Sequence, residues 1–469
     1  MSETKENNIG VLKRQHGLFV SFCFVIGFIV GTGIFLLPGR VLYEVGGNVN
    51  LGILAWVIGG LMIAPSVYMF SILASKYEHI HGFVDYSEAL VGKKYGYLAG
   101  WFFAVMYQPA GYAIIAWITS GFTATLVGLT TAHELYLPFR FFISAFFMAM
   151  AFIMNYLAPS LPVKFNVATT VARMIPLVLM GTVGVGIGFF MREHSVALIL
   201  TEEPLYGVAP VSAPAGLLPF AAISATAFAF NGWQAALAFN SEIKDSKRNF
   251  PIALVGGFLL VIVLYTLYFI GVTTASNDAA MLMMEGGGAN FAAGTHRAFR
   301  WVFGETLGSF LIGFMIISGL GILNACCLGM SRAMYSLGRR GLGPMPQRMA
   351  QLDPVTNVPN NSMVMAVGIG FVWLFVIFLN NVWDFTFSLP DFYNYSFFAM
   401  LVPIFVCFMA KHKELPFLQR FVAPMFAIGG ASFMFTTYWL GSALHAKVYT
   451  GTFVVLAIVG YCFYGKKGE

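Results

Sequence analysis

Three residues in the first apolar run have types and spacing suited to binding a small charged molecule. Gly31, Thr32 and Gly33 interrupt the run VIGFIVGTGIFLLPG (25–39) near its middle, although the run is apolar enough to cross a membrane. Non-helical backbone at membrane depth is tolerated where it lines a cavity or is buried in protein. The break frees amides that suit a carboxylate and carbonyls that suit an ammonium group or a cation.

The sixth apolar run has a second break of the same kind. Asn231 and Gly232 interrupt LLPFAAISATAFAFNGWQAALAFNSE (217–242) near its middle. Interrupted segments at corresponding positions of two halves are typical of an inverted-repeat transporter. An α-amino acid carries both a carboxylate and an ammonium group, so the pair of breaks predicts a site for a zwitterion made mostly of backbone. For one break alone, close packing of helices through small residues is the alternative.

A charged residue lies deep in the fifth run. Arg173 follows Val163 by ten residues in VKFNVATTVARMIPLVLMG, which is roughly 15 Å along a helix. A charge at that depth costs at least ~2.5–3.5 kcal/mol on insertion scales, so a function is the default interpretation. The alternative is a structural arginine between helices. Since arginine stays charged when buried, we expect a fixed cation near the middle of the membrane.

The elements that position these residues follow from composition. The chain has 469 residues, of which 58% are hydrophobic and only 10% charged, against about 25% charged in a soluble domain. A multi-pass membrane protein is therefore predicted. Apolar runs of sufficient length number twelve. They lie near 17–43, 51–74, 97–126, 138–157, 163–191, 215–241, 251–274, 305–337, 362–381, 391–410, 419–440 and 446–464.

The distribution of lysine and arginine predicts the orientation. With both termini in the cytoplasm, 19 of these residues fall on the cytoplasmic side and 5 on the other, as the positive-inside rule requires for a protein of the cytoplasmic membrane. The basic residues are dispersed over the cytoplasmic segments, which argues against nucleic-acid binding. Membrane lipid is the expected surrounding partner.

Four stretches together resemble a known family. They are GTGIFLLPGRVLYEVGG (31–47), GFVDYSEALVGKKYGYLAGW (82–101), FAFNGWQAALAFNSEIKDSKRNFPIAL (228–254) and LGMSRAMYSLGRRGLGP (328–344). The sequence resembles the amino acid–polyamine–organocation transporters, and within them bacterial L-amino-acid-transporter-like exchangers of the serine/threonine type.

The resemblance implies an all-α integral membrane fold of twelve transmembrane helices, with a 5+5 inverted repeat and discontinuous helices 1 and 6. The implied organisation has a cytoplasmic tail (1–16), a first repeat (17–191), a second repeat (215–410) and two final helices (419–464).

The resemblance also assigns substrate-binding roles at the first break. The amides of Thr32 and Gly33 and the Thr32 hydroxyl would bind the substrate carboxylate, beside Gly31. The Ile29 carbonyl would receive the α-ammonium group. Each of these roles uses backbone released by the break.

At the second break, the carbonyls of Phe228 and Asn231 would also receive the ammonium group, beside Gly232. The Phe228 ring would close over bound substrate as an outer lid. Gln108 in the third span, with Asn231 and Gln234 in the sixth, would give a polar pocket suited to small or polar neutral substrates.

Two further residues are implied for gating and coupling. Glu242, after the sixth span, corresponds to an acidic position that often takes part in the inner gate. Arg173 stands where sodium-independent members commonly have lysine, in the place where related transporters hold sodium. The resemblance therefore implies that Arg173 joins the first, fifth and eighth spans.

The predicted function is sodium-independent exchange of neutral amino acids by alternating access. Proton-coupled symport, and exchange of polyamines or of amino-acid derivatives such as sugar adducts, are the alternatives. A membrane-embedded enzyme would need polar clusters at depth, but the eight histidines lie at span ends or in loops and no phosphate-binding loop is present. We therefore expect no catalytic residues, no cofactor and no metal site.

Some members of the family pair with a glycoprotein heavy chain through a cysteine between the third and fourth spans. Residues 127–137 contain no cysteine. We therefore expect a stand-alone carrier, either a monomer or a homodimer.

Overall fold

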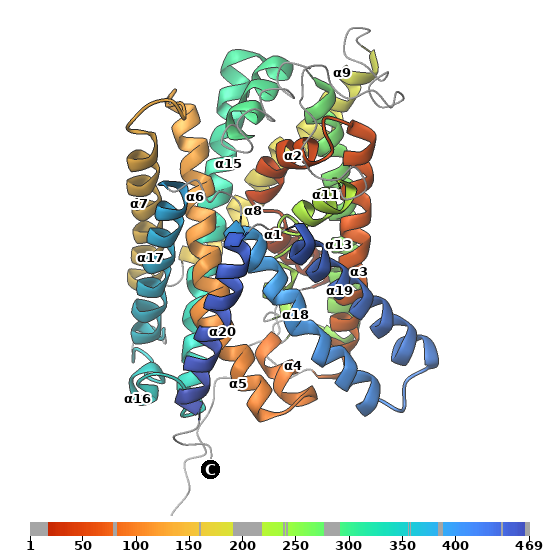
Figure 1. Ribbon diagram of the computed structural model, residues 1–469, viewed down its shortest axis with the longest axis vertical. Coiled ribbons are helices and arrows are strands. Elements are labelled where there is room, and N and C mark those ends of the chain that lie inside the picture. The colour runs from red at the N-terminus through yellow and green to blue at the C-terminus, as the bar shows by residue number, and fades with distance from the viewer. Residues whose placement is uncertain are drawn as a thin grey trace, which may run out of the picture.

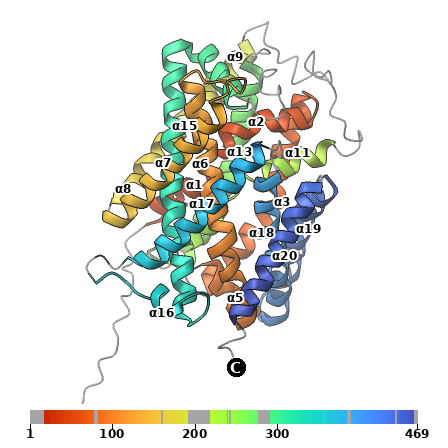
Figure 2. The same ribbon diagram turned by 60° about the vertical axis from the view of Figure 1, so that its left-hand side comes forward.

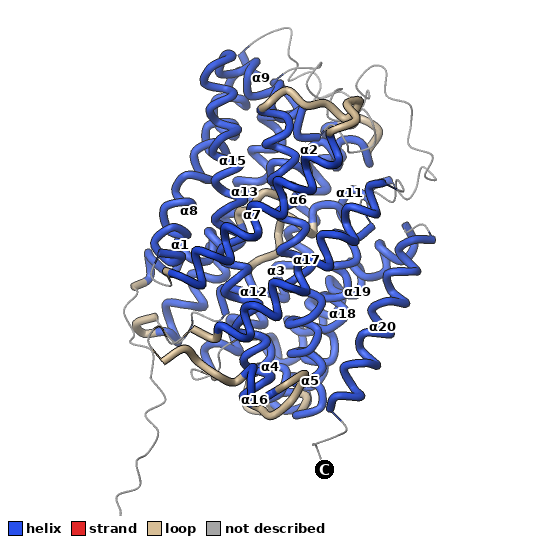
Figure 3. The backbone as a smooth tube through the Cα atoms, turned by 90° about the vertical axis from the view of Figure 1, so that its left-hand side faces the viewer, coloured by secondary structure: helices blue, strands red, loops and turns tan. Residues whose placement is uncertain are grey.

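The structure is a computed structural model of the chain. It describes residues 17–77, 82–158, 161–190, 218–237, 240, 243–275, 291–354, 356, 358–382, 388–441 and 444–464. These residues form helices and no β-strand. Figure 3 shows loop segments at both ends of the bundle and also halfway along it.

The first part of the bundle covers the first five predicted spans. Its elements are α1 (Leu18–Ile29), α2 (Gly33–Glu44), α3 (Val49–Lys76), α4 (Phe83–Leu90), α5 (Lys93–Trp101), the π-helical η1 (Phe102–Tyr107), α6 (Gln108–Leu126), α7 (Tyr136–Leu157), α8 (Leu161–Leu179), the π-helical η2 (Met180–Gly184) and α9 (Val185–Phe190).

The second part begins at the sixth predicted span. Its elements are α11 (Leu218–Thr226), α12 (Trp233–Ala236), α13 (Ser246–Ala275), α15 (Phe291–Arg339), α16 (Pro346–Met349), α17 (Asn360–Val382), α18 (Ser388–Lys411), the π-helical η5 (Leu418–Val422), α19 (Ala423–Gly441) and α20 (Leu444–Tyr464).

Helices occupy each of the predicted apolar runs. By length and composition, eight of the described helices can cross a membrane, and nine if the bent pair α1–α2 counts as one span. Within α15, Gly304 has φ 80° and ψ 167°, so the long helix is divided just before the predicted span 305–337. The remaining runs carry shorter or broken helices, and the count of twelve stays a prediction.

The two breaks lie inside the bundle because long helices surround them. α7 and α17 lie at one side, and α3 and α19 lie at the other (Figure 1). α13 packs along α3 and α1, while α15 packs along α6 and α8, as the second view also shows (Figure 2). The helices α4, α5 and α16 gather at the end of the bundle that carries the C-terminus.

Close approach of the helices depends on glycine. A Cβ atom on Gly271 of α13 would lie 2.1 Å from the Met180 carbonyl oxygen, and one on Gly430 of α19 would lie 2.0 Å from the Met62 carbonyl oxygen. Both neighbours are backbone atoms, which cannot rotate away. Small residues of this kind let membrane helices pack backbone to backbone.

We predict that Gly271→Ala destabilises the bundle, because its methyl group overlaps the backbone of η2. Overpacking of this kind typically costs ~1–3 kcal/mol. The matched control is Gly313→Ala in α15, where nothing lies within 4 Å of the added Cβ atom. Thermal unfolding of the purified proteins measures the difference. Equal Tm values for the two variants would contradict the proposed overlap.

Candidate functional site

The first break separates α1 from α2 and bends the pair by 50°. The helical pattern of α1 ends where the Val30 amide donates to the Ile26 carbonyl at 2.8 Å. α2 starts at Gly33, and the Phe35 amide donates to the Thr32 carbonyl at 3.2 Å. The last carbonyls of α1 and the first amides of α2 therefore lack the partners that a continuous helix supplies.

The second break spans residues 227–232, between α11 and α12. Gly232 has φ 110°, a conformation that strongly favours glycine. A Cβ atom on Gly232 would lie 2.1 Å from the Phe28 carbonyl oxygen of α1. The two breaks therefore meet with one backbone directly against the other, as the sequence prediction of a shared site requires.

Arg173 of α8 reaches the end of α1. Its Nη1 donates to the Val30 carbonyl at 2.8 Å and also to the Gly27 carbonyl. On its own helix, Nε donates to the Thr169 carbonyl at 3.1 Å and Nη2 donates to the Thr170 hydroxyl at 3.1 Å. The side chain is fully buried. The guanidinium group thus occupies the negative end of the α1 dipole and supplies donors to two carbonyls there.

The eighth span, in α15, approaches the same place through Thr169 of α8. A Cβ atom on Gly321 of α15 would lie 2.2 Å from Thr169 Oγ1. Thr169, on the same helix as Arg173, therefore packs directly against α15. The predicted connection of the first and fifth spans is direct, and α15 joins through this contact.

Tyr265 of α13 was not anticipated from the sequence. Its buried hydroxyl hydrogen is shared between two acceptors, the Ile29 carbonyl at 3.0 Å and the Ala229 carbonyl at 3.2 Å. One hydroxyl therefore bridges the two breaks. The only sequence signal was a hydroxyl-bearing residue inside an apolar helix, and that signal does not distinguish Tyr265 from other tyrosines.

Aromatic packing holds the second break from behind. The ring of Phe230 lies 5.8 Å from that of Trp56 and 5.3 Å from that of Tyr265. The Trp56 and Tyr265 rings are 5.7 Å apart, edge to face, an arrangement that aromatic pairs prefer. This cluster fixes the non-helical segment against α3 and α13, and the sequence did not indicate it.

Thr32, Gly33 and Phe228 lie together at the start of α2. The Thr32 side chain is buried, and its hydroxyl has no hydrogen-bond partner among the described residues. A Cβ atom on Gly33 would lie 2.9 Å from Phe228 Cδ1. The Phe228 ring, which is partly buried, therefore lies over the first amides of α2. A buried polar atom without a partner calls for an explanation, and a ligand that supplies the partner is one.

The two glutamines take up separate positions. The Gln234 amide contacts its own break, since Oε1 accepts from the Gly232 amide at 3.0 Å, and Nε2 donates to the Tyr107 hydroxyl of η1. Gln108 packs on α15, where its Oε1 would lie 2.9 Å from a Cβ atom on Gly329. Gln234 therefore connects the third and sixth spans in this structure.

Asn231 and Glu242 are the other residues predicted for the sixth span and the segment after it. Asn231 is buried, within the second break. Glu242, predicted for the inner gate, lies outside the described residues. Within the described part of the chain, no three His, Cys, Asp or Glu residues are grouped as metal ligands.

Comparison with known proteins decides the family. The family model described as amino acid permease matches residues 17–464 of the chain. This chain belongs to the amino acid permease family. The match includes both breaks and Arg173, and it makes the protein a multi-pass membrane transporter of amino acids rather than an enzyme.

Three relatives show the range of this permease's family. The serine/threonine exchanger SteT of Bacillus subtilis is 23% identical over 97% of each chain. The branched-chain amino acid permease BcaP of Lactococcus lactis is 24% identical over 94% of this chain and 92% of its own. The mouse large neutral amino acids transporter small subunit 2 is 22% identical over 74% of this chain and 62% of its own.

We predict that Gly33→Val removes amino acid binding by this permease while leaving it folded. The added side chain would displace the Phe228 ring and cover the first amides of α2. The matched control is Gly368→Val in α17, where nothing lies within 4 Å of the added Cβ atom. The measurement is the rise in Tm that a panel of L-amino acids produces in each purified protein. An unchanged rise for Gly33→Val would place the binding site elsewhere.

Proposed function

We propose that this permease exchanges neutral amino acids across the cytoplasmic membrane without sodium. The observation that carries the proposal is the hydrogen bonding of the Arg173 guanidinium group to the Gly27 and Val30 carbonyls. Carbonyls at the end of a broken membrane helix are the groups that bind sodium in related folds. Here a permanent cation already satisfies them.

The substrate site in this proposal is formed by the two breaks. The Thr32 hydroxyl and the first amides of α2 bind the carboxylate, with Gly31 and Gly33 allowing its close approach. The α-ammonium group binds carbonyls of the breaks at Ile29, Phe228 and Asn231. The buried Thr32 hydroxyl without a partner among the described residues supports this assignment.

The Ile29 carbonyl has an additional role in the proposed site. It already accepts the Tyr265 hydroxyl, but a carbonyl oxygen has two lone pairs and can accept a second donor. Tyr265 would then orient the carbonyl toward the ammonium group. The Phe228 ring acts as the outer lid, because it already lies over Gly33.

Neutral side chains are proposed for the substrate. The names of SteT and BcaP specify serine and threonine for one and branched-chain amino acids for the other. All of these are zwitterions with uncharged side chains. Asn231 provides a neutral polar group within the second break, whereas a polyamine lacks the carboxylate that Thr32 and the amides of α2 would recognise.

The assembly that we propose has twelve spans, an inverted repeat of residues 17–191 on 215–410, and both termini in the cytoplasm. The name of the mouse relative describes a small subunit, so some relatives work in larger assemblies. For this permease we propose a monomer or homodimer, because residues 127–137 contain no cysteine for a disulfide to a heavy chain.

We predict that uptake into proteoliposomes proceeds without sodium and is accelerated by amino acid on the far side. Replacing sodium with choline, or dissipating a proton gradient, should leave the initial rate within about twofold of its value. Preloading with unlabelled serine, threonine or leucine should accelerate uptake of the labelled amino acid severalfold. Strict dependence on sodium or on a proton gradient would refute the exchange mechanism.

We predict that Arg173→Ala reduces exchange far more than Arg173→Lys. Alanine leaves buried carbonyls without donors, at about 1–3 kcal/mol each, whereas lysine keeps a charge but loses the planar fork of donors. The lysine variant is also expected to show pH-dependent uptake, since a buried lysine can lose its proton near neutral pH.

The measurement for these variants is uptake at several pH values, with Tm recorded to detect unfolding. Arg140→Lys serves as the control, because Arg140 is an arginine of α7 that bonds the Trp117 carbonyl away from the breaks. Wild-type rates from Arg173→Ala would show that the residue has no part in transport.

A further inference from the structure

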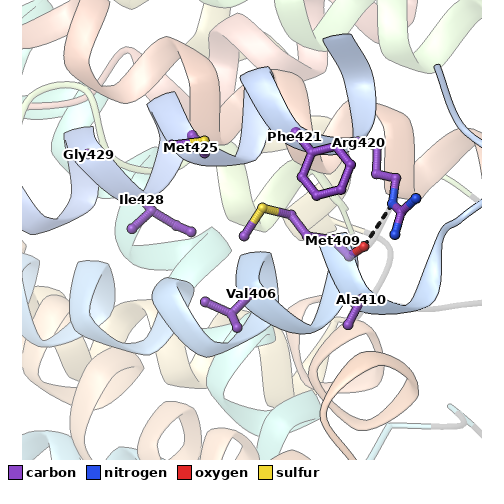
Figure 4. Close-up of a pocket in the computed structure, with 8 residues that line it drawn as sticks. All are labelled: Val406, Met409, Ala410, Arg420, Phe421, Met425, Ile428 and Gly429. Atoms are coloured by element: carbon purple, nitrogen blue, oxygen red, sulfur yellow. Dashed lines mark hydrogen bonds between the residues drawn. The ribbon is translucent and has the colours of Figure 1, made fainter. Parts of the chain in front are cut away.

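A groove lies on the side of the bundle between α18 and the continuous helix formed by η5 and α19 (Figure 4). Its volume is ≈ 700 Å³, within the range of about 300–1,000 Å³ that is typical of small-molecule sites. Seven of its eight lining residues are apolar, among them Val406, Met425 and Ile428. The eighth is Arg420. An apolar groove with a cation at one end matches a molecule with an apolar chain and an anionic group.

Arg420 has donors available for such a group. Its Nε donates to the Met409 carbonyl at 3.0 Å, and its guanidinium carbon lies 4.5 Å from the centre of the Phe421 ring. These two contacts hold the side chain at the end of the groove (Figure 4). A guanidinium group has five N–H donors, and within the described part of the chain the other four have no hydrogen-bond partner. They match the oxygens of a phosphate.

The surroundings of Arg420 are basic. Lys411 is the last residue of α18 and Lys413 lies on the turn between α18 and η5, and both are exposed. Glu414 is the one carboxylate among residues 406–429. It is bonded to Lys76, and this bond, as the largest cause, lowers the pKa of the carboxyl to about 2. Because Lys76 offsets the charge of Glu414, the turn presents a net positive charge.

The position of the groove within the membrane agrees with a cation at one end and apolar residues along the rest. Arg420 is in the first turn of the candidate membrane span Leu418–Thr436, where arginine lies at the level of the lipid headgroups. Gly429 at the other end is nine residues further along, or roughly 13 Å at the rise of an α-helix. The apolar part of the groove therefore extends from the headgroup level into the hydrocarbon.

We propose that this groove binds an anionic phospholipid. Its phosphate would bond the Arg420 guanidinium group, and one acyl chain would lie along Met425 and Ile428 toward Gly429. Basic pockets of membrane proteins recognise anionic headgroups in this way. A second copy of the permease fits this groove less well. In a symmetric dimer, the positively charged turn beside the groove would face the same turn of the other copy. In any other arrangement, it would face another part of a basic surface.

The experiment compares phosphatidylglycerol with phosphatidylcholine of the same acyl chains, by native mass spectrometry of the purified full-length chain. We expect the wild type to retain one phosphatidylglycerol in preference. Arg420→Gln should lower its retention about tenfold or more, because a charge-assisted hydrogen bond is lost, and should leave phosphatidylcholine unchanged. Gly429→Leu should lower the retention of both lipids, since its side chain enters the groove.

Two matched controls accompany these variants. Arg339→Gln removes an exposed arginine that stacks on Tyr335, and Gly368→Leu enlarges a helix glycine with nothing within 4 Å of its Cβ position. Both should retain lipid as the wild type does. Tm values without added lipid identify a variant that has failed to fold, in which case the other groove variant provides the test.

Three results would overturn the proposal. They are equal retention of both lipids by the wild type, wild-type retention of phosphatidylglycerol by Arg420→Gln, and a change in the dimer fraction of Gly429→Leu without a change in lipid. The last result would assign the groove to a second copy of the chain.

Discussion

The carbonyls at the end of α1 are the constraint on which the rest of the structure depends. Hydrocarbon offers no donors, so each carbonyl released by a broken helix must be satisfied by the protein or by a ligand. Arg173 supplies donors to Gly27 and Val30, and Tyr265 supplies one to Ile29. A break in α1 is stable only because α8 and α13 bring these two side chains to it.

That requirement explains the dense packing around the breaks. The arginine reaches α1 because the two helices are close, and a Cβ atom on Gly27 would lie 2.7 Å from Thr170 Oγ1. The opposite side is held by the aromatic cluster of Trp56, Phe230 and Tyr265. The polar groups of the site are thus fixed by large apolar contacts, which gives a preorganised backbone for binding.

Much of this architecture could be predicted from the sequence. Apolar runs predicted where helices lie, and glycine beside Thr32 and Asn231 predicted both breaks. The depth of Arg173 predicted a buried cation near the first break. These features are local, because hydropathy, helix breaking and depth along a helix can all be read from consecutive residues.

The partners of these residues could not be predicted in the same way. Tyr265 and Gln234 have their roles because of the direction in which their side chains point and the helix that faces them. The sequence placed Gln234 in the pocket, whereas its amide bonds Gly232 and Tyr107. Periodicity does not tell which polar residue of an apolar helix meets which neighbour, since that depends on the rotation of each helix in the bundle.

The contact between Gly232 and the Phe28 carbonyl has a mechanical consequence. No side chain stands between the two backbones at this contact, because position 232 is glycine. The spacing of the two broken spans is therefore set at this one point, and any residue larger than glycine at position 232 would force the two backbones apart.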